Sequence, residues 1–226
     1  MKPHSPARDP PRSLSYGRLA WPDPPLLPAD GPLRWPAMPA MTTAPVTGSV
    51  AMVMASPNFV RQRGLKDIAW VRSMGWATEP SFLSDRNLAT APALSAAAQR
   101  AYADASVADP MTAFDLAEIT DATPYSELLA YDALSLCQRQ DWSARLTAAG
   151  DFSRGGRLPV NLSGGVLTWN PLFCTGMIRI TELAAQIRGR AGAHQMADVN
   201  CGLAQAGSGF AMQYQAAIVL GKEARP

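Results

Sequence analysis

From Val46 onward, the apolar residues form short runs that are separated by glycine, proline and polar residues. Runs of about four to eight residues are typical of strands buried on one or both faces. The continuous run Val50–Ala55 predicts a strand buried on both faces, and the last two strands are joined by a Gly-Ser-Gly turn. Five strands are predicted in total, at 50–55, 67–78, 114–119, 199–206 and 213–220.

Between these strands, apolar residues recur at the three- and four-residue spacing of amphipathic helices. The pattern is clearest over Thr175–Arg188, and Ser56 with the following Pro57 gives the first helix a capped start. Helices are predicted at 57–64, 91–106, 126–137 and 175–188. This order of elements predicts an α/β domain with a mixed five-stranded sheet and helices packed on it.

The first 45 residues have a different character. Twelve of the twenty prolines precede Val46, so no regular helix or central strand is expected there. Five apolar side chains give this segment enough apolar surface to lie on a partner or on its own body: Trp21, Leu26, Leu27, Leu33 and Trp35. We therefore expect a proline-rich arm or linker over 1–45 and one domain over 46–226.

Composition excludes several classes of protein. The 226 residues are 47% hydrophobic and carry a net charge of +2, which argues against nucleic-acid binding and electrostatic attachment to membranes. The three cysteines are too widely spaced to indicate a zinc site or a disulfide framework. With neither a signal peptide nor an apolar run of transmembrane length in sight, the cytoplasm is the expected compartment.

The most informative motif is the glycine-rich loop GGRLPVNLSGGVLTWNPLFCTG, residues 155–176, which leads into the clearest helix. Together with three further blocks it resembles the C-terminal half of thiolases of the sterol-carrier-protein type. The four blocks are 30–56, 59–67, 118–134 and 156–189. The resemblance implies the thiolase half-domain fold, and it implies that the arm matches the linker between the two halves of a full thiolase. No segment resembles the N-terminal half, which in the family carries the nucleophilic cysteine.

The same resemblance implies that catalytic positions are replaced. The family's His-Asp-Cys-Phe segment reads Thr120, Asp121, Ala122 and Thr123, and the family's second histidine reads Asn170. An asparagine donates a hydrogen bond but does not shuttle a proton near pH 7. The chain offers only two histidines instead, His4 in the arm and His194 in a loop.

The remaining candidates each have a structural alternative. Asn170 is a candidate hydrogen-bond donor to an oxyanion, or a residue that caps the turn before Pro171. Cys174 precedes a helix, where a thiol pKa falls, but its family counterpart is a small packing residue. The substrate-binding candidates either shape the floor of the site or only maintain the fold: Asp121, Asn161, Gly164, Gly165, Gly207 and Gly209.

Other polar residues are interpreted as structural. Glu118 and Asp121, three apart at a strand end, are expected to point to different sides, with Asp121 anchoring the loop or capping the next helix. Cys137 is expected in the core, and Cys201 opens a strand without a catalytic counterpart. Tyr125 and Tyr131 are candidate acids for an aldolase-like variant of the superfamily, but packing is the preferred interpretation.

Three hypotheses follow. The favoured one is a thiolase-like subunit of CoA-thioester metabolism that is non-catalytic alone and associates with a thiolase-like partner, as a homo- or hetero-oligomer. The alternative is an acyltransferase or retro-aldol lyase that acts on an acyl-CoA at a site shared between subunits. A decayed gene product is the third. No cofactor or metal is called for, and a coenzyme A thioester is the candidate substrate.

Overall fold

The computed structural model describes residues 41, 43, 46–148, 150–168, 170–171 and 173–224. The arm predicted over 1–45 therefore lies outside the described residues, apart from Met41 and Thr43. The helices are α1 (Pro57–Arg63), α2 (Pro92–Ala105), α3 (Pro110–Ala113), α4 (Pro124–Ala133), α5 (Gly165–Thr168) and α6 (Thr175–Ile187). The strands are β1 (Trp70–Thr78), β2 (Leu116–Glu118), β3 (Cys201–Ser208) and β4 (Tyr214–Gly221).

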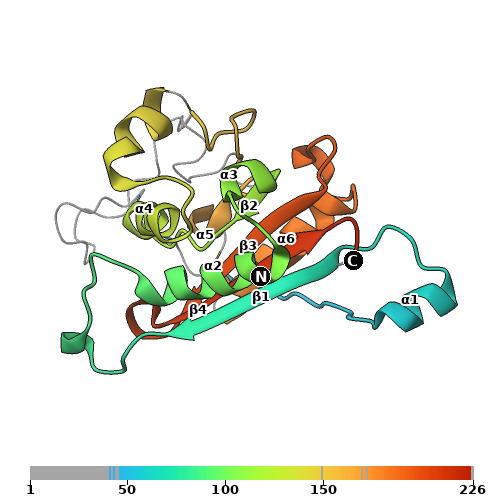
Figure 1. Ribbon diagram of the computed structural model, residues 1–226, viewed down its shortest axis with the longest axis horizontal. Helices are drawn as coiled ribbons and strands as arrows, with labels where there is room; N and C mark the ends of the chain where they lie inside the picture. The colour runs from blue at the N-terminus through green and yellow to red at the C-terminus, as the bar shows by residue number, and fades with distance from the viewer. Residues whose placement is uncertain are drawn as a thin grey trace, which may run out of the picture.

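The strands form one mixed sheet in the order β1-β4-β3-β2, with helices on both faces (Figure 1). The β1–β4 and β3–β4 pairs are antiparallel, and β2 is parallel to β3. Beyond β2 the sheet continues only as a single parallel bridge between Ala117 and Val160. The sheet is therefore four-stranded among the described residues, and the prediction of five strands was wrong in number.

The missing strand is the predicted run Val50–Ala55. It forms no strand, and its side chains are largely in solvent: Val53 is 99% exposed and Met54 is 76% exposed. The run has the apolar character of a buried strand, but no described strand lies beside it to supply hydrogen bonds. The pattern of apolar residues shows that a segment could be a buried strand, but it does not show whether a neighbouring strand is present to pair with it.

The other elements lie close to their predicted positions. Ser56 caps α1 by accepting a hydrogen bond from the Phe59 backbone, and Gly64 ends the helix in the left-handed conformation, as expected. The third helix begins earlier than predicted, because Thr123 forms a capping box with Ser126 in front of α4. It also ends earlier, at Ala133, since the chain then turns through Ser135 at φ 57°.

The main core lies between the sheet and the pair α2 and α4. The alanine-rich face of α2 allows a close approach to β1: a Cβ placed on Gly75 would lie 2.0 Å from the Ala97 carbonyl oxygen. Ala97 and Ala101 are fully buried there, and Tyr102 donates a hydrogen bond to the Leu134 carbonyl at 3.0 Å. A smaller core on the opposite face joins α6, through Leu183 and Ile187, to β2, β3 and β4.

Helix α6 covers only part of its face of the sheet. It packs mainly on β3 and β2, and among the described residues no helix covers the corresponding side of β1. Burial alternates along β1, so that Ser73 is buried towards α2 whereas Met74 and Trp76 are 46% and 65% exposed. Met74 and Trp76 pair across the ladder with Ile218 and Ala216 of β4. Met74, Trp76, Ala216 and the half-exposed Tyr214 are called the open sheet face below.

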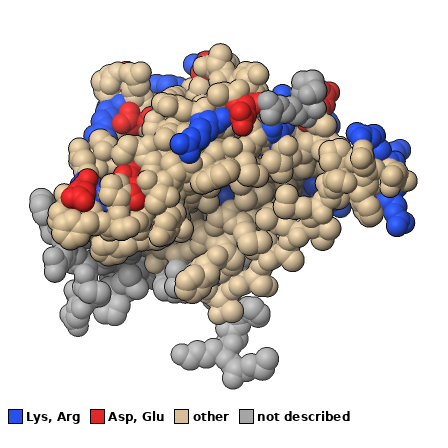
Figure 2. Space-filling model, turned by 60° about the horizontal axis from the view of Figure 1, so that its bottom comes forward, with Lys and Arg blue, Asp and Glu red and all other residues tan. Residues whose placement is uncertain are grey.

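The view in Figure 2 shows a face whose centre and lower part carry almost no Lys, Arg, Asp or Glu. None of the helices in the described part of the chain is both long enough and apolar enough to cross a membrane.

Candidate functional site

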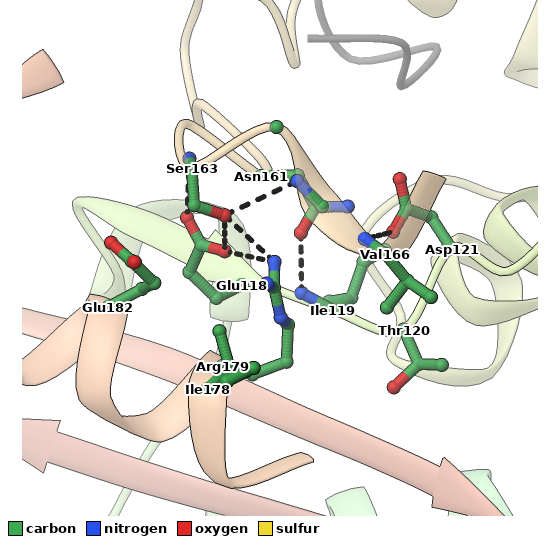
Figure 3. A network of polar contacts seen from close by, with 12 residues as sticks. Glu118, Ile119, Thr120, Asp121, Asn161, Ser163, Val166, Ile178, Arg179 and Glu182 are labelled. Atoms are coloured by element: carbon green, nitrogen blue, oxygen red, sulfur yellow. Dashed lines mark hydrogen bonds and ion pairs between the residues drawn. The ribbon is translucent and has the colours of Figure 1, made fainter. Parts of the chain in front are cut away.

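Several polar residues singled out from the sequence, Glu118, Thr120, Asp121 and Asn161, lie close together around the end of β2 (Figure 3). At the base of this region is a buried ion pair that the sequence analysis did not identify. Arg179 of α6 donates from Nη1 to Glu118 Oε2 at 2.8 Å, and each side chain is 1% exposed. Burial raises the pKa of Glu118, and the charge of Arg179 opposes that rise.

Ser163 of the glycine-rich loop completes this pair. Its hydroxyl donates to Glu118 Oε2 at 2.6 Å and accepts from Arg179 Nη1 at 2.8 Å, while its backbone N–H donates to Glu118 Oε1 at 3.1 Å. The loop is thereby attached to both β2 and α6. The sequence contains two signals for this pair. Glu118 is a charged residue at the end of an otherwise apolar strand, and Arg179 is a charged residue on an apolar helix face.

Asp121 holds the other end of the same loop. Its Oδ1 accepts a hydrogen bond from the Val166 backbone at 2.5 Å, which satisfies an N–H of the short helix α5. Gly165 has a φ of 66°, and a Cβ there would lie 2.2 Å from Asp121 Oδ2. Only glycine therefore fits beside this carboxyl. The expectation that Asp121 anchors the loop agrees with this contact, whereas the cap of α4 is Thr123.

Asp121 is fully buried. Burial, and then the negative charge of nearby Glu127, raise its pKa to about 8. Asp121 Oδ2 is buried and lacks a hydrogen-bond partner among the described residues. Glu127 itself accepts a hydrogen bond from the Tyr131 hydroxyl at 2.6 Å. Glu118 and Asp121 thus bind different residues of the same glycine-rich loop, Ser163 and Val166.

Asn161 hydrogen-bonds to the edge of β2 where a further strand would otherwise pair. Its backbone N–H donates to the Ala117 carbonyl and its Oδ1 accepts from the Ile119 N–H at 2.7 Å. It is fully buried with a φ of 54°, a conformation that asparagine tolerates better than most residues. Its Nδ2 is buried without a described partner. Asn161 therefore shapes the loop through its backbone and its side-chain oxygen.

Thr120 connects this loop to the glycine turn. Its backbone N–H donates to Gln205 Oε1 at 2.7 Å, and its hydroxyl accepts from the Gly207 N–H at 3.2 Å. Gly209 begins the turn at a φ of 78°, where a Cβ would lie 2.5 Å from the Tyr214 ring. Sequence analysis missed Gln205, a buried polar side chain in the middle of a strand.

Asn170 and Cys174 lie together at the start of α6. Asn170 Oδ1 accepts from the Thr175 hydroxyl at 2.7 Å, and the Cys174 Sγ donates to the Pro171 carbonyl at 3.3 Å. Within the described chain, Asn170 Nδ2 has no hydrogen-bond partner. The first turn of α6 reaches β3, since a Cβ on Gly176 would lie 2.6 Å from the Ala206 Cβ. This helix start is therefore close to the glycine turn.

The remaining candidates lie elsewhere. His194 contacts Glu182 through Nε2 at 3.2 Å, at the other end of α6. Cys137 is buried in the main core, and burial raises the pKa of the Cys201 thiol near Arg72. Tyr131 stacks on Phe152 with ring centroids 4.4 Å apart, while Tyr125 is half exposed on α4. His4 lies outside the described residues.

This arrangement supplies hydrogen-bond donors and one buried carboxyl, Asp121, whose pKa is raised, and no described histidine lies beside them. Among the described residues, no three His, Cys, Asp or Glu side chains gather as metal ligands. The chemistry available is the binding of an oxygen acceptor by N–H groups.

Comparisons with known proteins agree with the fold. The family model described as Thiolase C-terminal domain-like matches residues 75–222, which include all four strands except the start of β1. Sterol carrier protein 2 from Oryctolagus cuniculus is 32% identical over 155 residues, and so is the protein from Homo sapiens. Each match covers 66% of this chain and 28% of the relative, so the chain spans little more than a quarter of these curated relatives.

Two solved structures have the same fold. The first, titled Ltp2-ChsH2(DUF35) aldolase, superposes with a TM-score of 0.57 at 23% identity, over 68% of this chain and 39% of that chain. The second is a monomeric SCP2-thiolase like protein type 1 from Mycobacterium smegmatis, with a TM-score of 0.52 at 18% identity. That match covers 73% of this chain and 32% of the other.

Proposed function

Because this chain belongs to the thiolase C-terminal domain-like family, we propose that it is a thiolase-like subunit of CoA-thioester metabolism that works with a partner chain. The partner would be a second thiolase-like body, either another copy or a different chain. Alone, the subunit would be non-catalytic. The single observation that carries this proposal is the open sheet face beside α6.

The open sheet face favours association because it exposes large apolar side chains in a row. Met74 and Trp76 lie on the same side of β1 and are 46% and 65% exposed, and Tyr214, which pairs with Thr78 at the start of β4, is 51% exposed. Contiguous apolar surface of this kind typically marks an interaction site. The exposed run Val50–Ala55 adds a second apolar segment without a described neighbour.

The chemistry of the site supports a non-catalytic role. Ala122 has no titratable group, and Asn170 cannot accept and return a proton near pH 7. The Cys174 Sγ lies 3.3 Å from the Pro171 carbonyl oxygen, to which the thiol donates a hydrogen bond. The first two of these positions supply no proton shuttle.

Light scattering coupled to size exclusion tests the association. The purified chain should elute as an oligomer or bind a hydrophobic dye, and Trp76→Glu should reduce both. Phe82→Glu is the matched control, because Phe82 is 66% exposed but lies outside the sheet. A sharp monomer at 24.1 kDa that binds no dye would contradict the proposal.

Thiolysis of acetoacetyl-CoA by the isolated chain tests the lack of activity. We expect no loss of thioester absorbance above the uncatalysed rate. Turnover that disappears in Cys174→Ala would overturn this part of the proposal and make Cys174 the nucleophile.

A second candidate function is a retro-aldol lyase or acyltransferase with a site shared between subunits. The similar structure titled Ltp2-ChsH2(DUF35) aldolase favours it, since that title names an aldolase together with a second protein. In this chain the half-exposed Tyr125 would be the acid, close in sequence to the buried Asp121. The chain would be co-purified with its partner and the rate of carbon–carbon cleavage measured. Cleavage that is lost in Tyr125→Phe would favour this candidate, and the absence of cleavage would favour the first.

A further inference from the structure

A separate cavity lies on the face of the sheet that α2 and α4 cover. It has a volume of about 200 Å³ and opens beside the 3₁₀ turn Phe210–Met212. Its walls are mainly aliphatic, from Leu94 of α2, Leu129 and Ala130 of α4, and Met212. Pockets for drug-sized ligands are typically about 300–1,000 Å³, so this cavity suits a smaller molecule.

The inner end of the cavity is a chain of amide groups. Gln205 Oε1 accepts from the Thr120 N–H, Gln205 Nε2 donates to Gln215 Oε1 at 2.9 Å, and Gln215 Nε2 donates to the Met212 carbonyl at 2.8 Å. Each side-chain NH₂ group has two hydrogens, and these contacts use one of each. Each oxygen accepts one bond as well. The inner end therefore keeps an unused N–H on each amide that a ligand carbonyl can accept from.

Gly207 makes room for this amide chain. A Cβ on Gly207 would lie 3.1 Å and 3.2 Å from the two terminal atoms of the Gln215 amide and 2.3 Å from the Met212 methyl group. Gly207 is one of the substrate-binding candidates from the sequence, and it adjoins the Gln215 amide that lines the cavity. A larger residue at this position would press on the Met212 methyl group and on the Gln215 amide.

The rim of the cavity is close to electrically neutral. Arg86 donates to the carbonyls of Phe210 and Ala211 at 2.9 Å and 2.7 Å and so holds the turn in place. Its Nε is buried without a partner among the described residues. Glu79, on the same rim, accepts the Ala93 N–H at the start of α2. One cation and one anion at the entrance favour an uncharged ligand.

We propose that this cavity binds a small neutral aliphatic carbonyl compound, either a short ketone or the acyl part of a thioester. The chain of the ligand would lie against Leu94, Leu129 and Met212, and its carbonyl oxygen would accept from the free N–H of Gln205 or Gln215. This binding site is distinct from the open sheet face, and it does not depend on a partner or on catalysis. Its failure would leave the proposed function untouched.

Nuclear magnetic resonance of the full chain labelled with ¹⁵N-glutamine tests the proposal directly. The probes are 2-hexanone and S-hexanoyl-N-acetylcysteamine, with hexanoate as the charged comparison. We expect saturable shifts of the side-chain NH₂ signals of Gln205 and Gln215 with one or both neutral probes, and weaker shifts with hexanoate. A response to the thioester alone would assign the ligand to acyl thioesters, and a response to the ketone would admit free ketones.

A cavity-filling variant supplies a second measurement. Leu129→Trp should weaken binding by about tenfold, equivalent to excluding roughly two methylene groups from the cavity. Phe59→Trp, at a 46% exposed position of α1 that does not line the cavity, should leave binding unchanged. If Leu129→Trp does not fold, the wild-type glutamine signals decide alone. Shifts at Gln186, which lines a different cavity, or no shifts with either neutral probe would overturn the proposal.

Discussion

Removing Arg179 from the buried ion pair should strongly destabilise the domain. In Arg179→Met, the Glu118 carboxylate keeps only Ser163 as its charge-stabilising neighbour, although its side chain is 1% exposed. Leaving one partner of a buried pair unpaired costs about 3–5 kcal/mol. A domain of this size loses roughly 2–4 °C in melting temperature per kcal/mol. We therefore expect a decrease of roughly 6–20 °C at pH 7.

The pH dependence of the variant identifies the cause. Burial raises the pKa of Glu118, and loss of the Arg179 charge raises it further. The folded state then holds a proton on Glu118 at a pH where the unfolded chain has lost it. The variant should therefore recover stability as the pH falls towards 5, and the difference from wild type should shrink.

Two further variants complete the experiment, with thermal unfolding followed by circular dichroism. Arg190→Met is the control, because the Arg190–Asp67 pair is 3.9 Å apart and more than half exposed, and such pairs contribute at most about 1 kcal/mol. Glu118→Gln in the Arg179→Met background should restore part of the loss, since no buried charge remains. A decrease no larger than that of Arg190→Met, or one that does not depend on pH, would refute the reasoning.

Three other predictions use the same glycine-rich loop. The folded-state pKa of Asp121, about 8, lies above its unfolded value, so its contribution to stability is complete below about pH 4 and is lost as the pH rises to 8. Asp121→Asn should therefore flatten the stability–pH curve over that window in urea titrations, whereas Asp104→Asn, at an exposed site, should not. Gly165→Ala should lower the free energy of unfolding by more than about 2 kcal/mol, because the new Cβ would sit at a positive φ and against Asp121. Gly189→Ala is the control, since Gly189 has a φ of 68° but open space around it, and it should lower the free energy of unfolding by about 1 kcal/mol. Equal losses in the two variants would contradict the contact with Asp121. In a reconstituted active complex, Asn170→Ala should slow turnover by about 10²–10³ if its amide donates to an oxyanion, while unchanged turnover with a lower melting temperature would leave only its bond to Thr175.

Regular elements with local signals could be predicted from the sequence. Helix α6 has the 3.6-residue spacing of apolar residues, and α1 has Ser56, Pro57 and Gly64 at the positions that caps require. The strands β3 and β4 follow from two apolar runs and the glycine turn between them. In each case the signal lies within the element itself, so no knowledge of distant residues was needed.

Contacts between distant residues could not be predicted. Val50–Ala55 has the composition of a buried strand, yet whether it becomes one depends on a neighbour that its own residues do not specify. The Glu118–Arg179 pair joins residues 61 positions apart, and each alone is an ordinary charged residue. The role of Asp121 was anticipated as an anchor, but its target, the Val166 N–H, became visible only once the loop was folded.

The position of β1 at the edge of the sheet has a consequence for the life of this protein in the cell. An edge strand carrying Met74 and Trp76 on its open side, preceded by the uncharged exposed run Val50–Ala55, combines the features that drive strands of identical chains to stack. In newly made copies, productive pairing should then compete with aggregation, and the aggregated fraction should rise steeply with concentration. We expect the yield of native protein to depend on how soon after synthesis the chain meets the partner that covers the open sheet face.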